Sequence, residues 1–203
     1  MENKSRAIGL RVAAGVLIAI TIIVAVISSG IQLPSTKNET GRLTVLLKDA
    51  PVEVDELWIT VTGLEVHRVG DDDGGWLPID FSTLTDELTF NLLEYQDEKV
   101  LDLADVEIAV GTYNKIRMNV TEAEAWYYLE VDENGAPINE ESIDKVELKV
   151  PSDRIDVITR FNITAAENVV VLIDMQPDWV SISKSNNLRP VLKASVSQSQ
   201  EDD

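Results

Sequence analysis

Residues 145–150 read KVELKV, and the strict alternation of apolar and charged residues determines their structure. Val146, Leu148 and Val150 occupy every second position, with a glutamate or a lysine between them. Successive side chains of a β-strand point to opposite faces of a sheet, so this spacing places the three apolar side chains together. The stretch therefore predicts a strand with one buried face and one exposed face.

The same alternation recurs along the chain. The apolar positions are Ile116, Met118 and Val120 within 113–120, and Ile155, Val157, Phe161 and Ile163 within 155–163. Further strands are expected at 42–48, 87–93, 125–131 and 188–196. Short strands joined by turn residues predict an all-β fold, and we expect an antiparallel β-sandwich of the immunoglobulin-like or transthyretin-like kind over residues 42–196.

Three stretches depart from plain alternation. In 57–67 the apolar residues change phase, which predicts a β-bulge near Thr62 and Gly63 because one extra residue moves the following side chains to the other face. The stretch 168–175, NVVVLIDM, is apolar in both phases and predicts a central strand covered on both faces. The apolar spacing of 98–108 predicts a short helix.

The N-terminal part predicts a membrane segment. Residues 12–33, VAAGVLIAITIIVAVISSGIQL, carry no charge and are long enough to cross a bilayer as a helix. Lys4, Arg6 and Arg11 precede this segment, and basic residues stay on the cytoplasmic side. The alternative is a secretory signal cleaved near SSG at 28–30, which would release the protein. The expected order is a cytoplasmic N-terminus at 1–11, a single-pass transmembrane anchor at 12–33, a linker at 34–41, an extracellular sandwich at 42–196 and a disordered tail at 197–203.

Composition restricts the partners and the chemistry. The chain has 36 acidic and 17 basic residues and a formal net charge of −19, so it repels nucleic acid. It has no cysteine, which excludes disulfides, a thiol nucleophile, cysteine-bound zinc and a lipid-modified cysteine. The expected partners are the membrane, through the N-terminal helix, and envelope proteins or glycans.

Three Asn-x-Thr tripeptides are candidate glycosylation sites for an exported chain. They begin at Asn38, Asn119 and Asn162. Asn119 and Asn162 fall on the polar phase of their predicted strands, so a glycan on either residue is expected to point into solvent.

Two acidic stretches are candidate calcium loops. The candidate ligands are Asp71, Asp72 and Asp73 in the stretch GDDDGG at 70–75, and Asp132 and Asn134 in the stretch VDENGAPINEE at 131–141. Contiguous aspartates do not match the alternate spacing of an EF-hand loop. Glycine and aspartate also suit tight hairpin turns, so turn formation and weak calcium binding, strengthened if the two stretches lie side by side, both remain open. No other cofactor is expected.

Single polar residues give weaker signals. His67 is the only histidine, and we expect it to pack at a strand end beside Glu65. Asp49 ends one apolar strand and Asp174 interrupts another, and both are expected to cap loop amides, with a ligand or metal role as the alternative.

The aromatic residues offer a different hypothesis. Trp76, Trp126, Tyr127, Tyr128 and Trp179 are candidates for a sugar-stacking platform, although aromatic residues on strands are more often core or cross-strand pairs. No nucleophile elbow, zinc-protease motif or phosphate-binding loop is present, so we expect the protein not to be an enzyme.

The order of several motifs resembles a known family. The motifs are LTVLLKDAP (43–51), ITVTGLEVHR (59–68), Trp76, FNLLEY (90–95), VGTYNKIRMNV (110–120), LKVPS (148–152), VLID (171–174) and LRPVLKASV (188–196). Together they resemble an uncharacterised domain family of archaeal and bacterial cell-surface proteins. The resemblance implies an exported β-sandwich, often held to the cell by a lipid-modified cysteine that this chain lacks.

The matching positions Asp49, His67, Tyr113 and Arg117 carry no assigned role in that family. The Gly111-Thr112-Tyr113 turn resembles a tyrosine at a sandwich corner, and Arg117 is expected to project from an otherwise exposed face.

Three functions follow from these observations. The leading prediction is a non-catalytic, membrane-anchored cell-surface domain with a structural or ligand-binding role in the envelope. The first alternative is a pilin-like filament subunit, because residues 5–26 are similar to an archaeal pilin leader, although Arg11 lies inside the matching region. The second alternative is an extracellular glycan-acting hydrolase, which no motif supports.

Overall fold

The computed structural model describes residues 39–49, 52–70, 75–83, 85–165, 167–177, 182 and 184–200. All of them belong to one compact unit, Asn38–Asp203. The predictions for 1–11, 12–33, most of the linker, Asn38, Asp71, Asp72, Asp73 and Trp179 fall outside the described residues. Within the described ranges, no helix is long and apolar enough to cross a membrane.

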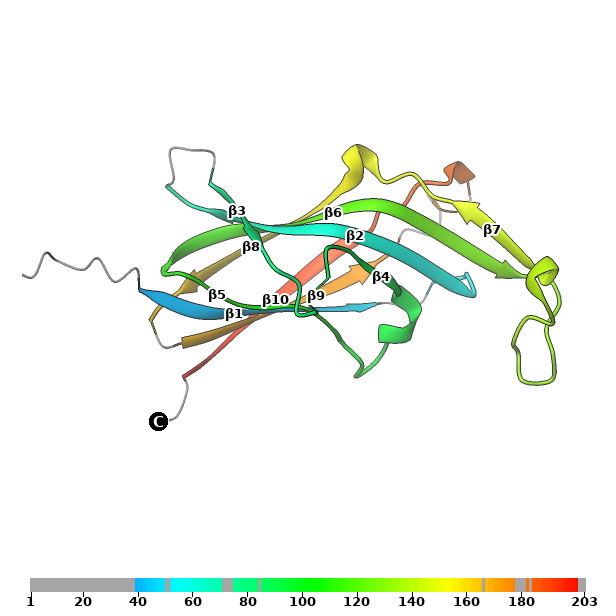
Figure 1. The fold of residues 1–203 in the computed structure, drawn as a ribbon, viewed down its shortest axis with the longest axis horizontal. Coiled ribbons are helices and arrows are strands. Elements are labelled where there is room, and N and C mark those ends of the chain that lie inside the picture. Colours follow the sequence, from blue (N-terminus) through cyan, green and yellow to red (C-terminus); the bar gives the residue numbers. More distant parts are fainter. Residues whose placement is uncertain are drawn as a thin grey trace, which may run out of the picture. The chain divides into compact units, whose positions relative to one another are not determined.

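The described residues form ten strands in two sheets (Figure 1). The four-stranded sheet has the order β10-β9-β1-β5, with β1 (Thr40–Asp49), β5 (Leu101–Ala109), β9 (Glu167–Gln176) and β10 (Val191–Gln200). The six-stranded sheet has the order β3-β2-β6-β7, with β4 paired to β2 and β8 paired to β6. Its strands are β2 (Glu56–Arg68), β3 (Trp76–Ile79), β4 (Leu88–Asn91), β6 (Gly111–Tyr128), β7 (Ile143–Glu147) and β8 (Arg154–Ile163). Short 3-10 turns lie at η1 (Leu92–Tyr95), η2 (Glu140–Ser142) and η3 (Pro151–Asp153).

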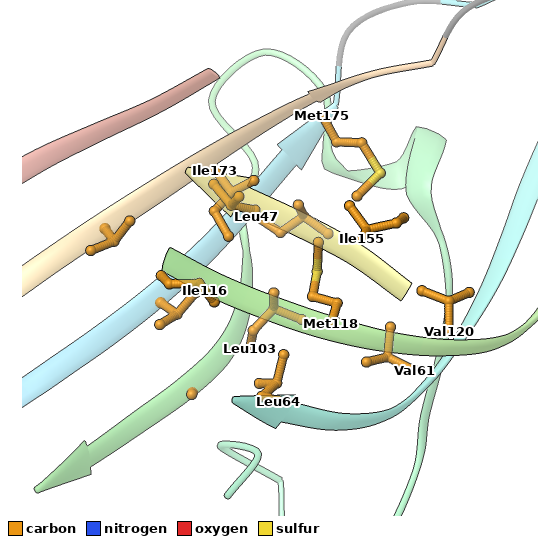
Figure 2. Packing of buried hydrophobic residues seen from close by; sticks show 14 of the residues in the cluster. Leu47, Val61, Leu64, Leu103, Ile116, Met118, Val120, Ile155, Ile173 and Met175 are labelled. Carbon is orange, nitrogen blue, oxygen red and sulfur yellow. The ribbon is translucent and has the colours of Figure 1, made fainter. Parts of the chain in front are cut away.

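The alternating apolar residues of both sheets form one hydrophobic core. Leu47 and Ile173 of the four-stranded sheet lie close to Ile116, Met118 and Ile155 of the six-stranded sheet (Figure 2). Each fully buried side chain of this kind contributes about 1.5–3 kcal/mol through the hydrophobic effect. The alternation in 113–120, 145–150 and 155–163 is therefore confirmed, and the two-layer β fold with it.

The four-stranded sheet is not purely antiparallel. Strand β9 pairs with β10 antiparallel but with β1 parallel, from Arg42 opposite Asn168 to Asp49 opposite Met175. Strand β9 lies inside the sheet, as its apolar sequence predicts, but only one of its faces is fully buried. Strand β10 continues to Gln200, so residues 197–200 pair with β9 instead of belonging to the predicted disordered tail.

The predicted bulge in β2 is confirmed, and a second bulge faces it in β6. Thr60 pairs with Glu122 and Val61 with Val120, so Thr121 is extra on β6. Gly63 pairs with Asn119, so Thr62 is extra on β2. Because both strands change phase at the same level, the apolar side chains of both stay on the core side along their full length.

The helix predicted at 98–108 is wrong, because these residues contain strand β5. Opposite Val45 and Leu46 the register of β5 skips one residue, and Leu103 and Ala104 are both fully buried. The bulge places buried positions three and four residues apart, a spacing that imitates the period of a helix.

Tyr113 forms the predicted tyrosine corner at the start of β6. Its hydroxyl donates a hydrogen bond to the carbonyl oxygen of Ala109 at 2.8 Å, and its ring stacks on Phe161 with the ring centroids 5.4 Å apart. A Cβ at Gly111 would lie 2.8 Å from Nε of Arg68, so glycine leaves room there for the guanidinium group. The turn thus links β5, β6 and β8 through one buried side chain.

Candidate functional site

The second acidic stretch is a hairpin connection, and the described flanks of the first stretch are paired strands. Strands β2 and β3, on either side of the first stretch, pair antiparallel up to His67 opposite Trp76. In the second stretch, the Asp132 carboxylate accepts hydrogen bonds from the amides of Asn134 and Ala136 at 2.8 and 3.0 Å, and Gly135 takes a φ of +82°. These amide contacts lower the pKa of Asp132. Asp132 and Asn134 are therefore used in a tight turn.

The described residues on either side of the first stretch do not lie beside the second stretch. Arg68, just before the first stretch, pairs with Tyr113 near the start of β6, whereas the second stretch follows Tyr128 at the end of β6. The length of β6 therefore separates Arg68 from the second stretch (Figure 1). Among the described residues, no group of three or more histidine, aspartate or glutamate side chains is placed to hold a metal ion.

A polar cluster lies where β3, β2, β6 and β8 are neighbours. We call it the Arg117 cluster, and its members are His67, Trp76, Asn114, Arg117 and Asp156. Arg117 donates from Nε and Nη2 to the two carboxylate oxygens of Asp156, at 2.7 and 2.9 Å. Its guanidinium carbon lies 3.7 Å from the centroid of the Trp76 ring. His67 packs edge-on against Trp76, and its Nδ1 lies 2.8 Å from Oδ1 of Asn114.

The members of the Arg117 cluster are engaged with one another. The Arg117 side chain is only 15% exposed, so the expectation that it projects from an open face is wrong. Asp156 contacts it from the adjacent strand β8, and Trp76 covers it from β3, on the far side of β2. The Arg117 guanidinium lowers the pKa of Asp156, because its hydrogen bonds favour the charged carboxylate. This geometry indicates a cross-strand lock that holds the short strand β3 against the sheet.

A second group of aromatic residues borders a cavity at the other end of β2 and β6. The cavity measures about 190 Å³ and is lined by Trp58, Thr60, Thr89, Glu122, Ala123, Glu124 and Trp126. We call it the aromatic cleft. The double bulge positions it, because the phase change turns Trp58 and Trp126 away from the core while Leu57 and Ala125 point inward. The two rings are both half-buried, with their centroids 5.5 Å apart and their planes tilted by 42°.

Carboxylates fix the orientation of both indoles. Nε1 of Trp126 donates to Glu124 at 3.0 Å, and Nε1 of Trp58 donates to Glu56. The hydroxyl of Tyr128 also donates to Glu56, and burial together with this carboxylate raises the pKa of Tyr128 to about 12. The cleft therefore presents aromatic rings beside fixed carboxylates, the combination of apolar surface and few polar groups that is typical of ligand sites.

Comparison with known proteins identifies the domain. Residues 40–193 match the family described as a domain of unknown function, DUF4382. The chain belongs to the DUF4382 family. Comparisons with curated proteins and with solved structures gave no match.

The residues that carry the family resemblance have structural contacts in this DUF4382 domain. His67 and Arg117 belong to the Arg117 cluster, and Tyr113 forms the corner. Asp49 is 5% exposed and accepts a hydrogen bond from Nε2 of Gln96 at 3.1 Å.

Asp174 has a different partner from the loop amides that the sequence suggested. It is ion-paired with Lys48 across the parallel pair of strands β1 and β9, with Nζ and Oδ2 3.6 Å apart.

The structure brings together only some of the aromatic residues proposed for a sugar platform, and their binding of sugar stays a prediction. Trp126 and Tyr128 lie together near the aromatic cleft, whereas Trp76 lies in the Arg117 cluster and Tyr127 packs against the core. Trp58, the partner of Trp126, was missed by the sequence analysis. Its outward phase between Leu57 and Ile59 was the available signal.

The described glycosylation candidates differ in accessibility. Asn162 is exposed on β8, and its Oδ1 accepts a hydrogen bond from the Thr112 hydroxyl at 2.9 Å. Asn119 is half-buried over Gly63, where an added Cβ would lie 3.1 Å from its Nδ2. The geometry favours Asn162 as an acceptor, and occupancy of either site stays a prediction.

Proposed function

We propose that this DUF4382 domain is a non-catalytic binding module on the outer face of a cell membrane, and that its ligand is an envelope glycan bound at the aromatic cleft. The observation that carries the proposal is the paired indoles of Trp58 and Trp126, with Glu122 and Glu124 beside them on the cavity wall. Aromatic pairs on strands are usually packed in the core, but these two rings border a cavity instead.

The chemistry of the aromatic cleft suits a sugar ring. One face of a pyranose is a flat array of C–H groups, which packs on an indole, and its hydroxyl groups donate to carboxylates. Glu124 has a fixed orientation because it already accepts from Trp126. Thr60 and Thr89, with hydroxyl oxygens 2.9 Å apart, add hydroxyl groups that donate or accept.

The cavities favour an oligosaccharide over a single sugar. A second cavity, of about 430 Å³, is lined by Thr62, Gly63 and Leu64 of β2 and by residues between Pro78 and Asp86. The aromatic cleft uses the preceding stretch of the same strand, through Trp58 and Thr60. The two cavities thus use successive stretches of β2, and an oligosaccharide offers more than one sugar unit to them.

The binding prediction is tested by replacing Trp58. We expect Trp58→Ala to weaken binding of an oligosaccharide by more than about tenfold, because a tryptophan at the centre of a site commonly carries much of the affinity. The full-length chain in detergent is titrated with hexamers of glucose and of N-acetylglucosamine, and binding is followed by tryptophan fluorescence and calorimetry.

The matched control is Ile158→Ala on β8, where the side chain is 81% exposed and lies outside the cleft. This variant is expected to bind like the wild type. Equal affinities of Trp58→Ala and wild type, with both folded by circular dichroism, would refute the cleft as the binding site.

The membrane part of the proposal rests on residues 12–33, whose uncharged apolar sequence follows three basic residues. We expect the chain to sediment with membranes after carbonate washing, with the C-terminal domain accessible to protease from outside. The intact mass of the mature protein separates the alternatives, because an anchor is retained, a secretory signal is removed, and pilin-type processing cuts near Ala7. A soluble product of full-length mass would contradict the anchor.

A further inference from the structure

We infer that the glycan bound in the aromatic cleft carries free amino groups, so that the ligand is a cationic amino-oligosaccharide. The inference rests on the proposed function, since it specifies the ligand of the same site. It is carried by the charges around the two indoles and by the way one protein ammonium group already binds there.

The wall of the aromatic cleft is negatively charged. Glu122 and Glu124 line the cavity, and Glu56 is held between Trp58 and Tyr128 by hydrogen bonds. Glu147 of β7 lies directly opposite Glu124 of β6 in the sheet register. Like charges in directly opposed positions destabilise a sheet, and a cation between them removes that repulsion.

A single lysine near the cleft shows how an ammonium group fits. Nζ of Lys145 lies 3.9 Å from the centroid of the Trp126 ring, in the geometry of a cation–π contact. Lys145 pairs with Trp126 across β6 and β7, next to the opposed pair of Glu124 and Glu147. The protein's own lysine therefore shows that the Trp126 ring accepts a primary ammonium group, beside two glutamates in the sheet register.

Charge balance favours a cationic ligand over a neutral one. Four glutamates lie in the paired positions of β2, β6 and β7 around the cleft: Glu56, Glu122, Glu124 and Glu147. In these pairs of described residues, Lys145 is the one basic residue. An ammonium on the ligand gains from each carboxylate, whereas a neutral sugar gains only hydrogen bonds. Because the cleft is partly open to solvent, this gain is expected to weaken as salt is added.

The test compares two hexamers that differ only in acetylation. The full-length chain is titrated with the hexamer of glucosamine and with the hexamer of N-acetylglucosamine, at low and at high salt. We expect the amino form to bind at least about tenfold more tightly at low salt, a difference of about 1.4 kcal/mol. Glu124→Gln should reduce this preference. The control variant Glu107→Gln, on the edge strand β5 of the four-stranded sheet, should keep it.

The outcomes separate the two proposals. Equal binding of both hexamers, weakened alike by Trp58→Ala, would overturn the amino-group inference and leave glycan binding in place. Absence of binding by either hexamer, with the protein folded, would overturn both. Spermidine is the third probe, and if it binds as tightly as the glucosamine hexamer, the cleft recognises amines and the glycan proposal fails.

Discussion

Replacing Tyr113 with alanine is expected to lower the free energy of unfolding by about 3–5 kcal/mol, the usual cost of removing a fully buried aromatic side chain. The Tyr113 side chain is completely buried, its ring stacks on Phe161, and its hydroxyl bonds to the backbone at Ala109. Its loss leaves a cavity and a carbonyl group without this donor where β5 turns into β6. Urea denaturation followed by circular dichroism measures the change.

Tyr113→Phe separates the hydrogen bond from the packing. This variant keeps the ring against Phe161 and removes only the donor to Ala109, so we expect a loss of about 1 kcal/mol. If Tyr113→Ala and Tyr113→Phe lose the same stability, the ring contributes nothing beyond its hydroxyl and the corner is wrongly described. The two variants together therefore measure how much of the corner depends on packing.

The sequence predicts strands well where each strand's register is unbroken. Strand β7 shows the period of two in its apolar residues, and no register shift falls between its paired positions. Strand β8 shows the same period at Ile155 and Val157, before its register against β6 shifts between Ile158 and Phe161. Strand β5 was misread as a helix because its bulge at Leu103 depends on the register against β1, which is distant in sequence. The parallel pairing of β1 with β9 was missed for the same reason, since no local pattern records which strand a given strand will meet.

The candidate site was harder to predict than the fold. Trp126 was recognised as a possible platform residue, but its partner Trp58 comes from a strand roughly seventy residues earlier, and only the sheet register brings them together. The calcium hypothesis treated acidic residues as free ligands. In the second stretch the Asp132 carboxylate is instead used by backbone amides, a local role that composition alone does not distinguish.

The family motifs and the aromatic cleft have different roles in this chain. The motifs ITVTGLEVHR (59–68) and VGTYNKIRMNV (110–120) contribute His67, Tyr113 and Arg117, whose contacts hold strands to one another. Trp58 and Trp126 lie outside those quoted motifs and border a cavity. We therefore interpret the motifs as determinants of the fold, whereas the proposed glycan binding depends on the two tryptophans outside them.

The second large effect is expected from Arg117→Met, which should lower the free energy of unfolding by about 2 kcal/mol. The variant keeps an apolar side chain of similar length, but Asp156 loses its two hydrogen bonds and Trp76 loses its cation. Since Arg117 lowers the pKa of Asp156 in the folded protein, its contribution depends on pH. It is fully present above the ordinary aspartate pKa of about 3.9 and is lost as the pH falls through the lower folded-state value.

Arg42→Met provides the matched control, because Arg42 makes the same two-point contact with Asp105 on the other sheet. The Arg42 side chain is 50% exposed, so solvent screens this pair and its loss should cost only about 0.2–1 kcal/mol. Urea midpoints of both variants and the wild type, measured from neutral to acid pH, compare the two pairs directly. Equal losses would show that burial beneath Trp76 adds nothing to the Arg117 pair. A larger loss for Arg117→Met that shrinks in acid would establish the cluster as the lock on strand β3.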